Sequence, residues 1–177
     1  MCLRLPVRSA LDIYLMLKDK IKDDVKSALK AGDATRRTTL STLLSAVKNK
    51  ELEKRSKLAK SGTPADQLDS ASMLSDDEVV EVLGSEIKKR KESAEIYTNA
   101  GRPELAEQEK SEVEMLAVYM PEQLSEDVIR EKVREAVKNT GAAGPKDMGK
   151  VIGQVMSAVK GQADGQVVSR IVKEELQ

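Results

Sequence analysis

The residues best suited to chemistry lie near the C-terminal end, between positions 146 and 160. In a helix of about 3.6 residues per turn, one side of this segment would carry only lysines, glycines and a serine. These residues are Lys146, Gly149, Lys150, Gly153, Ser157 and Lys160. No acidic residue lies on that side, and Asp147 falls beside it. Ammonium groups next to a surface with few side chains suit the binding of phosphate groups.

The two glycines need a reason, because each exposed glycine in a helix costs about 1 kcal/mol relative to alanine. A glycine lets another backbone approach closely, whether that of a nucleic acid or that of a second helix. The residues alone leave both interpretations open: phosphate binding, or tight helix packing with lysines spread around the contact. Since no aromatic residue is near to stack on bases, any nucleic-acid recognition here should depend on shape and backbone.

The composition excludes several kinds of active site. The 177 residues include no histidine and one cysteine, Cys2. Histidine-based catalysis, histidine-ligated metal, an intrachain disulfide and a cysteine-cluster metal site are therefore excluded. We expect no catalytic residue, no metal and no cofactor. The acids Asp76, Asp77 and Glu78 suit the first turn of a helix, where they complement the helix dipole.

Charge is segmented, although the formal net charge is zero. Basic residues predominate in residues 1–60, acidic residues predominate in 61–135, and 136–177 has a small basic excess. The charges alone favour segments that complement one another within the fold over flanks that hold a polyanion. The basic run Lys88, Lys89, Arg90 and Lys91 would spread around a helix, so we predict that it forms solvated surface. No apolar run approaches the ~20 residues that cross a bilayer, so we expect no membrane partner and a cytoplasmic location.

The remaining pattern predicts an all-α, multihelical fold. The chain has no Phe or Trp and three tyrosines, Tyr14, Tyr97 and Tyr119, so aliphatic residues must build the core, which suits helix packing. We expect a long-helix bundle or hairpins over residues 16–120, followed by a small three-helix subdomain over 121–177. We expect residues 1–15 to be an N-terminal extension, with a longer first helix as the alternative, and residues 61–74 to be a flexible connection rich in Gly, Pro, Ser and Asp.

Capping residues define most of the expected helix ends. We expect N-caps at Asp33, Ser75, Ser125 and Asp164, with Glu78 completing a capping box with Ser75. Gly32, Gly101 and Gly161 should end helices, and Pro103 should begin one. The spacing also places Val80, Ala117 and Val128 on buried faces, and the charged end of the second helix, residues 48–60, in solvent.

Several motifs in a fixed order resemble the GatB/YqeY family. They are SEIKKRKESAEIY at 85–97, GRPELAEQEKSEVEMLAVYMPEQLSE at 101–126 and DMGKVIGQVM at 147–156. Residues 146–176 also resemble the C-terminal tail domain of the GatB subunit of tRNA-dependent amidotransferase, through GQVM at 153–156, Lys160-Gly161, Ala163, Val168 and the Glu-Glu-Leu ending. The likeness covers about residues 16–177.

The resemblance implies a two-part helical protein that contacts the body of tRNA. By position, Lys146, Lys150 and Lys160 would face the RNA, and Gly149 and Gly153 would provide clearance. It implies tRNA as a partner, with amidotransferase subunits or an aminoacyl-tRNA synthetase as protein partners. Because the chain lacks the large GatB domain that amidates tRNA, we predict a non-catalytic tRNA-binding or amidotransferase-associated module. Two alternatives stay open: a protein–protein adaptor without RNA, and the family-level activity of a carbon–nitrogen ligase with glutamine as amide donor.

Overall fold

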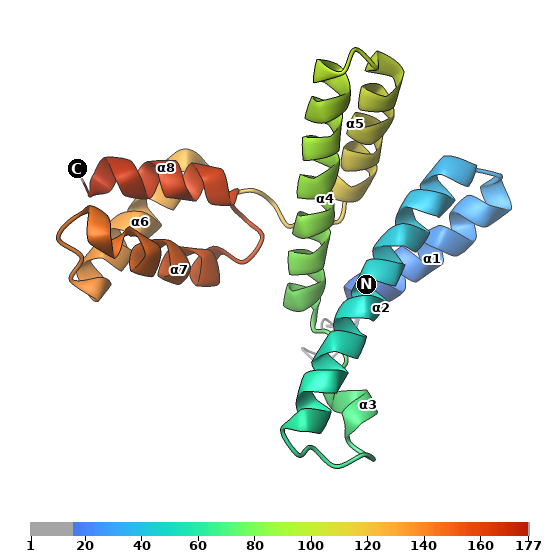
Figure 1. Cartoon of the computed structure of the whole chain (residues 1–177), viewed down its shortest axis with the longest axis horizontal. Coiled ribbons are helices and arrows are strands. Elements are labelled where there is room, and N and C mark those ends of the chain that lie inside the picture. The colour runs from blue at the N-terminus through green and yellow to red at the C-terminus, as the bar shows by residue number, and fades with distance from the viewer. Residues whose placement is uncertain (1–15, 177) are drawn as a thin grey trace, which may run out of the picture. The chain divides into compact units, whose positions relative to one another are not determined.

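The computed structural model describes residues 16–176, and this part of the chain is all-helical, as predicted (Figure 1). Eight α-helices and one short 3₁₀-helix follow one another within it, without a strand. The chain divides into two compact units, one ending at Tyr119 and the other beginning at Met120. Cys2, Tyr14 and the N-terminal extension lie outside the described residues.

The first unit contains two helical hairpins joined by a short helix. The first hairpin is α1 (Met16–Ala31) with α2 (Ala34–Lys60), and the second is α4 (Asp76–Asn99) with α5 (Pro103–Ala117). Each hairpin turns at a glycine in the left-handed region, Gly32 at φ +71° and Gly101 at φ +68°. A Cβ atom makes this left-handed conformation costly, so glycine, which has none, suits both turns.

The predicted caps are confirmed. Asp33 accepts a hydrogen bond from the Arg36 N–H at 2.9 Å, and Ser75 and Glu78 form a capping box at the start of α4. Pro103 occupies the first turn of α5. These local interactions satisfy N–H groups that a helix start leaves unpaired, and they explain why the sequence located these ends well.

Residues 61–74 were predicted as a flexible connection, and that prediction was wrong. They contain α3 (Leu68–Ala71), and both Leu68 and Leu74 are buried. Two apolar side chains in a Gly- and Ser-rich segment are too few to show a period, yet they are enough to pack the segment onto α2. The segment is thereby held against its own hairpin.

The first unit has an aliphatic core. Its fully buried residues include Ile21, Leu40, Leu43, Val47, Val79, Leu83 and Leu116. On α4, Val79 takes the buried place predicted for Val80, because Val79 lies four residues before Leu83 and shares its side of the helix. Ala117, predicted as buried, is exposed, since α5 ends there.

Two charged residues predicted as solvated surface are buried instead. Arg90, from the basic run, is only 8 % exposed and donates to Glu86 on its own helix at 2.9 Å and to Glu112 of α5 at 3.0 Å. Glu51, in the charged end of α2, accepts hydrogen bonds from Lys18 of α1 and from the Leu74 N–H. Buried charges need such partners, and periodicity alone does not reveal them.

Tyr119 joins the end of the first unit to α1. Its side chain is buried, its hydroxyl donates to Asp24, and the Lys20 ammonium lies 5.6 Å from its ring centroid. Burial and the hydrogen bond to Asp24 raise the pKa of Tyr119 to about 12, against the opposing effect of Arg36. The hydroxyl therefore stays protonated at neutral pH and can hold this contact.

Replacing Arg90 by leucine should destabilise the first unit by about 3 kcal/mol, because Glu86 and Glu112 would lose their shared guanidinium in a largely buried position. Urea unfolding of the full chain measures this loss. Lys88→Leu, at an exposed neighbouring position, is the matched control and should change stability by less than about 0.5 kcal/mol. Equal losses in the two variants would contradict a structural role for the Glu86–Arg90–Glu112 cluster.

Acid should weaken the fold partly through Glu86. Burial alone would raise the pKa of Glu86, but hydrogen bonds from Lys89 and Arg90 outweigh it and hold that pKa below its ordinary value of 4.5. Such a group contributes stability above its unfolded pKa and loses it as pH falls through the lowered folded pKa. Unfolding free energies measured from pH 7 to pH 3 should therefore fall less steeply below pH 4.5 in Glu86→Gln than in the wild type. Parallel curves would exclude this contribution.

Candidate nucleic-acid interface

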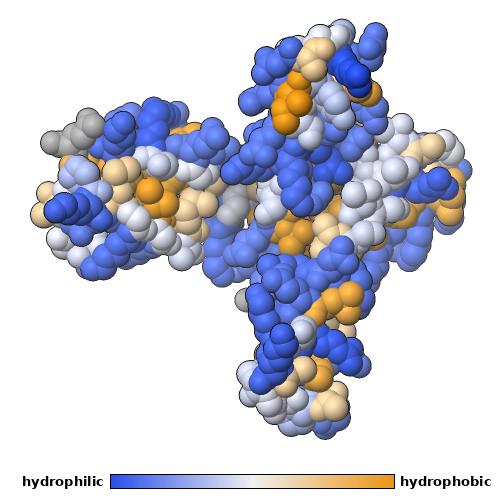
Figure 2. Space-filling model, in the orientation of Figure 1, coloured by the Kyte–Doolittle hydropathy of each residue, from blue (hydrophilic) through white to orange (hydrophobic). Residues whose placement is uncertain are grey.

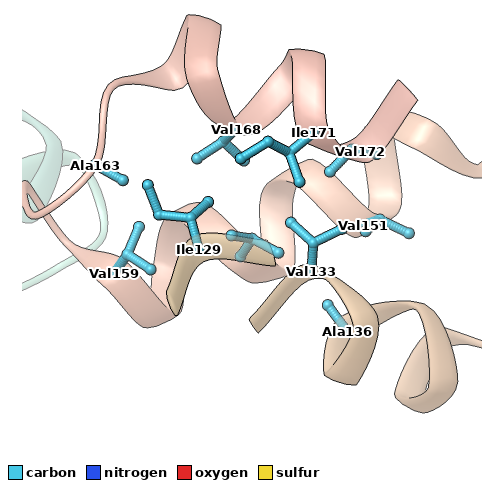
Figure 3. Close-up of a cluster of buried hydrophobic side chains, with 10 residues drawn as sticks. Ile129, Val133, Ala136, Val151, Val159, Ala163, Val168, Ile171 and Val172 are labelled. Carbon is cyan, nitrogen blue, oxygen red and sulfur yellow. The ribbon is translucent and has the colours of Figure 1, made fainter. Parts of the chain in front are cut away.

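The second unit consists of α6 (Glu126–Thr140), the 3₁₀-helix η1 (Pro145–Asp147), α7 (Met148–Val159) and α8 (Gly165–Glu175). One cluster of small aliphatic side chains from all three α-helices forms its core (Figure 3). The cluster comprises Ile129, Val133, Ala136, Val151, Val155, Val159, Ala163, Val168, Ile171 and Val172. Val128, predicted on the buried face of α6, is 37 % exposed, and Ile129 takes its place.

Valines at four-residue spacing orient α7. Val151, Val155 and Val159 are almost fully buried, and residues four apart share one side of a helix. The opposite side of α7 must therefore face away from the core of its own unit. That opposite side carries the residues predicted as the interface.

An ion-pair network joins α6 to α8 and occupies the acids of α8. Arg130 donates to Glu174 at 2.6 Å and to Glu175 at 2.9 Å, and Arg134 donates to Glu175 at 2.9 Å. The hydrogen bond from Arg130 lowers the pKa of Glu174, and those from Arg134 and Arg130 lower the pKa of Glu175. These carboxylates are held by arginines of α6 rather than by the lysines around α7.

All six residues predicted for RNA binding are exposed. We call them the α7 strip: Lys146, Gly149, Lys150, Gly153, Ser157 and Lys160. Helix α7 itself contains no acidic residue. The nearby Asp147 is half-buried, and its carboxylate accepts a hydrogen bond from the Ala143 N–H at 3.1 Å. The strip is thus a cationic surface without a carboxylate of its own.

The glycines of the α7 strip are open. A Cβ added at Gly149 or at Gly153 would meet no atom within 4 Å outside its own helix turn. Packing within the described residues therefore gives no reason for glycine at either position. The Ser157 hydroxyl donates to the Gly153 carbonyl at 2.9 Å, which keeps this side chain close to the helix surface.

The three lysines of the α7 strip differ in their location and in their hydrogen bonds. Lys146 belongs to η1, and its side chain makes no hydrogen bond or ion pair within residues 16–176. The Lys150 ammonium lies 3.3 Å from the Thr140 carbonyl, to which it donates at the end of α6. Lys160 is the C-cap residue of α7, and its N–H donates to the Met156 carbonyl. Lys150 therefore also supports its own unit, whereas Lys146 projects from it.

Two further exposed residues of α7, Gln154 and Ala158, lie between the strip and the buried side of the helix and were not among the predicted site residues. They follow Gly153 and Ser157 directly, so a wider arc of the same helix would have included them. They add one amide and one methyl group beside the strip, again without a negative charge.

The other candidates from the sequence have structural roles. Asp76 accepts a hydrogen bond from the Leu17 N–H at 3.3 Å, and Glu78 completes its capping box. Within residues 16–176, no group of three or more acids and cysteines is placed to hold a metal ion. In the same range, no helix combines the length and apolar character needed to span a membrane.

The fold and the α7 strip together define an all-helical protein of two units, one of which presents a cationic helix surface. The chain matches the family model described as Yqey-like protein over residues 18–176, and it belongs to that family. The GatB/YqeY resemblance found in the sequence is therefore confirmed for the YqeY family.

Two curated relatives carry the name "Altered inheritance of mitochondria protein 41, mitochondrial". The protein from Eremothecium gossypii is 29 % identical over 100 residues, which cover 56 % of this chain and 46 % of the relative. The protein from Lachancea thermotolerans is 32 % identical over 107 residues, which cover 60 % of this chain and 49 % of the relative. The chain thus spans about half the length of these relatives.

Because the glycines of the α7 strip are open, Gly149→Ala and Gly153→Ala should each stabilise the second unit by about 1 kcal/mol, the difference in helix propensity. Urea unfolding of the full chain measures this gain. Gly161→Ala is the control, and it should destabilise, because Gly161 has φ +73° and alanine is strained there. Loss of stability in either α7 variant would mean that the chain itself packs against the strip.

Proposed function

We propose that this protein is a non-catalytic RNA-binding module whose α7 strip contacts the phosphate backbone of a structured RNA, with tRNA as the foremost candidate. The observation that carries this proposal is the pair of open glycines, Gly149 and Gly153, on an exposed helix side that has lysines and no acids. An isolated unit would be more stable with alanine at both positions. A partner that approaches the helix backbone closely would explain why these positions are glycine and not alanine.

The chemistry of the strip favours a polyanion as that partner. Lysines at positions 146, 150 and 160 flank the bare segment, and ammonium groups neutralise phosphates with release of counterions. No aromatic side chain lies on the strip to stack on a base, so contacts would be made to phosphates and sugars, which position a nucleic acid without reading its sequence. Duplex RNA suits such contacts, because proteins recognise it mainly by shape, 2′-hydroxyls and phosphates.

The family likeness supports tRNA over other RNAs. Residues 146–176 resemble the tail domain of the GatB subunit of tRNA-dependent amidotransferase, which contacts the tRNA body. We therefore propose association with amidotransferase subunits or an aminoacyl-tRNA synthetase as the protein context, and we assign no catalytic step to this chain. Since the relatives are named as mitochondrial proteins, we propose a mitochondrial location in place of the cytoplasmic one expected from the sequence.

A protein–protein adaptor is the second candidate, and one observation favours it. Gly149, Gly153 and Ser157 repeat at four-residue spacing, and small residues at that spacing let two helix backbones approach closely. In this case, the lysines would surround a helix contact instead of phosphates. A partner that remains bound after nuclease treatment and in high salt, with no RNA retained, would favour the adaptor.

Neutralising lysines of the α7 strip should weaken tRNA binding and its salt dependence. In the full-length variant Lys146→Gln/Lys150→Gln, we expect the slope of log Kd against log salt to fall by about 1.4 to 1.8, since each phosphate contact contributes about 0.7 to 0.9. Fluorescence anisotropy with unmodified tRNA at several KCl concentrations measures this slope. Thermal melting of the variant checks that loss of the Lys150–Thr140 hydrogen bond leaves the unit folded.

The matched control is Lys138→Gln/Lys173→Gln, which removes two exposed lysines from α6 and α8 of the same unit. The control should retain wild-type affinity and slope. If both double variants lose binding equally, the effect comes from net charge and not from the strip. If neither changes binding, the α7 strip is not the RNA site.

A further inference from the structure

A second exposed cationic surface lies on the first unit, along the first part of α2. Residues 34–50 include no acidic residue. From residue 37 to residue 49, one side of the helix carries only basic, hydroxyl and amide side chains, all exposed. We call this side the α2 strip: Arg37, Thr38, Ser41, Thr42, Ser45, Lys48 and Asn49.

The core of the first unit fixes the outward direction of the α2 strip. Leu40, Leu43 and Val47 are fully buried on the other side of the same helix segment. Arg37 and Lys48 are eleven residues apart, which is three helical turns, so the two cations lie on one side about 16 Å from each other. Hydroxyl groups occupy the turns between them.

Several hydrogen-bond donors of the α2 strip are available. Within residues 16–176, the side chains of Arg37, Thr38, Ser41 and Asn49 make no hydrogen bond or ion pair. Lys48 forms an ion pair with the buried Glu51 at 3.7 Å, and Glu51 also accepts a hydrogen bond from Lys18. Thr42 and Ser45 differ, because their hydroxyls donate to carbonyls of their own helix at 3.0 Å.

The acids of the same hairpin are occupied by other groups. Residues 16–50 contain nine basic and four acidic side chains. Asp19 and Asp23 pair with Lys22 and Lys26 at 2.8 Å. Asp24 accepts from Tyr119, and Asp33 caps α2. Residues 16–50 therefore carry more cations than carboxylates, and beyond them Glu51 and Glu53 of α2 pair with Lys48 and Lys50.

We infer that the α2 strip is a second contact surface for the phosphate backbone of a nucleic acid, separate from the α7 strip. Arginine, lysine, hydroxyl and amide donors are the groups that proteins use for phosphate and sugar contacts. A membrane surface fits less well, because helices that lie on membranes need an apolar face beside their cations. The exposed large apolar side chain nearest the strip on α2 is Leu52, one turn beyond Lys48, and on the face that Figure 2 shows apolar residues form only small, separate groups. The inference concerns residues outside the α7 strip, so either surface can fail without the other.

The test replaces both ends of the strip in the full-length protein, as Arg37→Gln/Lys48→Gln. With unmodified tRNA, we expect the slope of log Kd against log salt to fall by about 1.4 to 1.8 and the affinity at 0.1 M KCl to fall about tenfold. The matched control is Lys88→Gln/Lys110→Gln, exposed lysines of α4 and α5 in the same unit that have carboxylates within 3.9 Å. Wild-type affinity and slope in the Arg37/Lys48 variant would overturn the inference.

Two further measurements distinguish RNA binding by the α2 strip from RNA binding by the α7 strip and from membrane binding. A loss of binding in the Arg37/Lys48 variant, with none in Lys146→Gln/Lys150→Gln, would reject the α7 proposal and support the α2 strip. The reverse result would reject the α2 strip alone. Flotation with phosphatidylserine vesicles tests the membrane directly: vesicle binding lost in the Arg37/Lys48 variant, with tRNA binding unchanged, would show a lipid surface and overturn the nucleic-acid assignment.

Discussion

Burial of Val151, Val155 and Val159 determines which side of α7 meets solvent, and the candidate interface depends on that single constraint. The second unit contains no aromatic side chain, so its small core must close around β-branched and alanine side chains at regular spacing. Once those valines are packed, Gly149 and Gly153 can only lie outside. The arginines of α6 then hold the acids of α8, which keeps the α7 surface cationic.

The two cationic strips share a physical design. Each lies on a helix whose opposite side is buried by aliphatic residues, and no acid is among the residues of either strip. They differ in what accompanies the cations: the α7 strip has bare backbone, whereas the α2 strip has hydroxyl and amide donors. The sugar-phosphate backbone of an RNA could approach the α7 strip closely, whereas the α2 strip could donate hydrogen bonds to it. Neither surface requires base recognition, which suits a ligand identified by shape.

The sequence predicted the helices well because their ends carry local chemistry. Caps such as Ser75 with Glu78, and glycines such as Gly101, act within a few residues and can be found without tertiary information. The α7 strip was also accessible from periodicity, although the openness of its glycines depends on what packs nearby. Arg90 and Glu51 were misassigned, because their partners are distant in sequence and a charged residue normally indicates surface. The packing of residues 61–74 was missed because two isolated leucines carry no period.

The central claim is that RNA meets the bare side of α7. The most direct measurement follows backbone amide signals of the ¹⁵N-labelled full chain by NMR while unmodified tRNA is added at low salt. The account predicts that the signals of Gly149 and Gly153 shift or broaden at the first additions, while those of Glu131 and Glu135 on the exposed side of α6 change little. Saturable tRNA binding that leaves Gly149 and Gly153 unperturbed would contradict it.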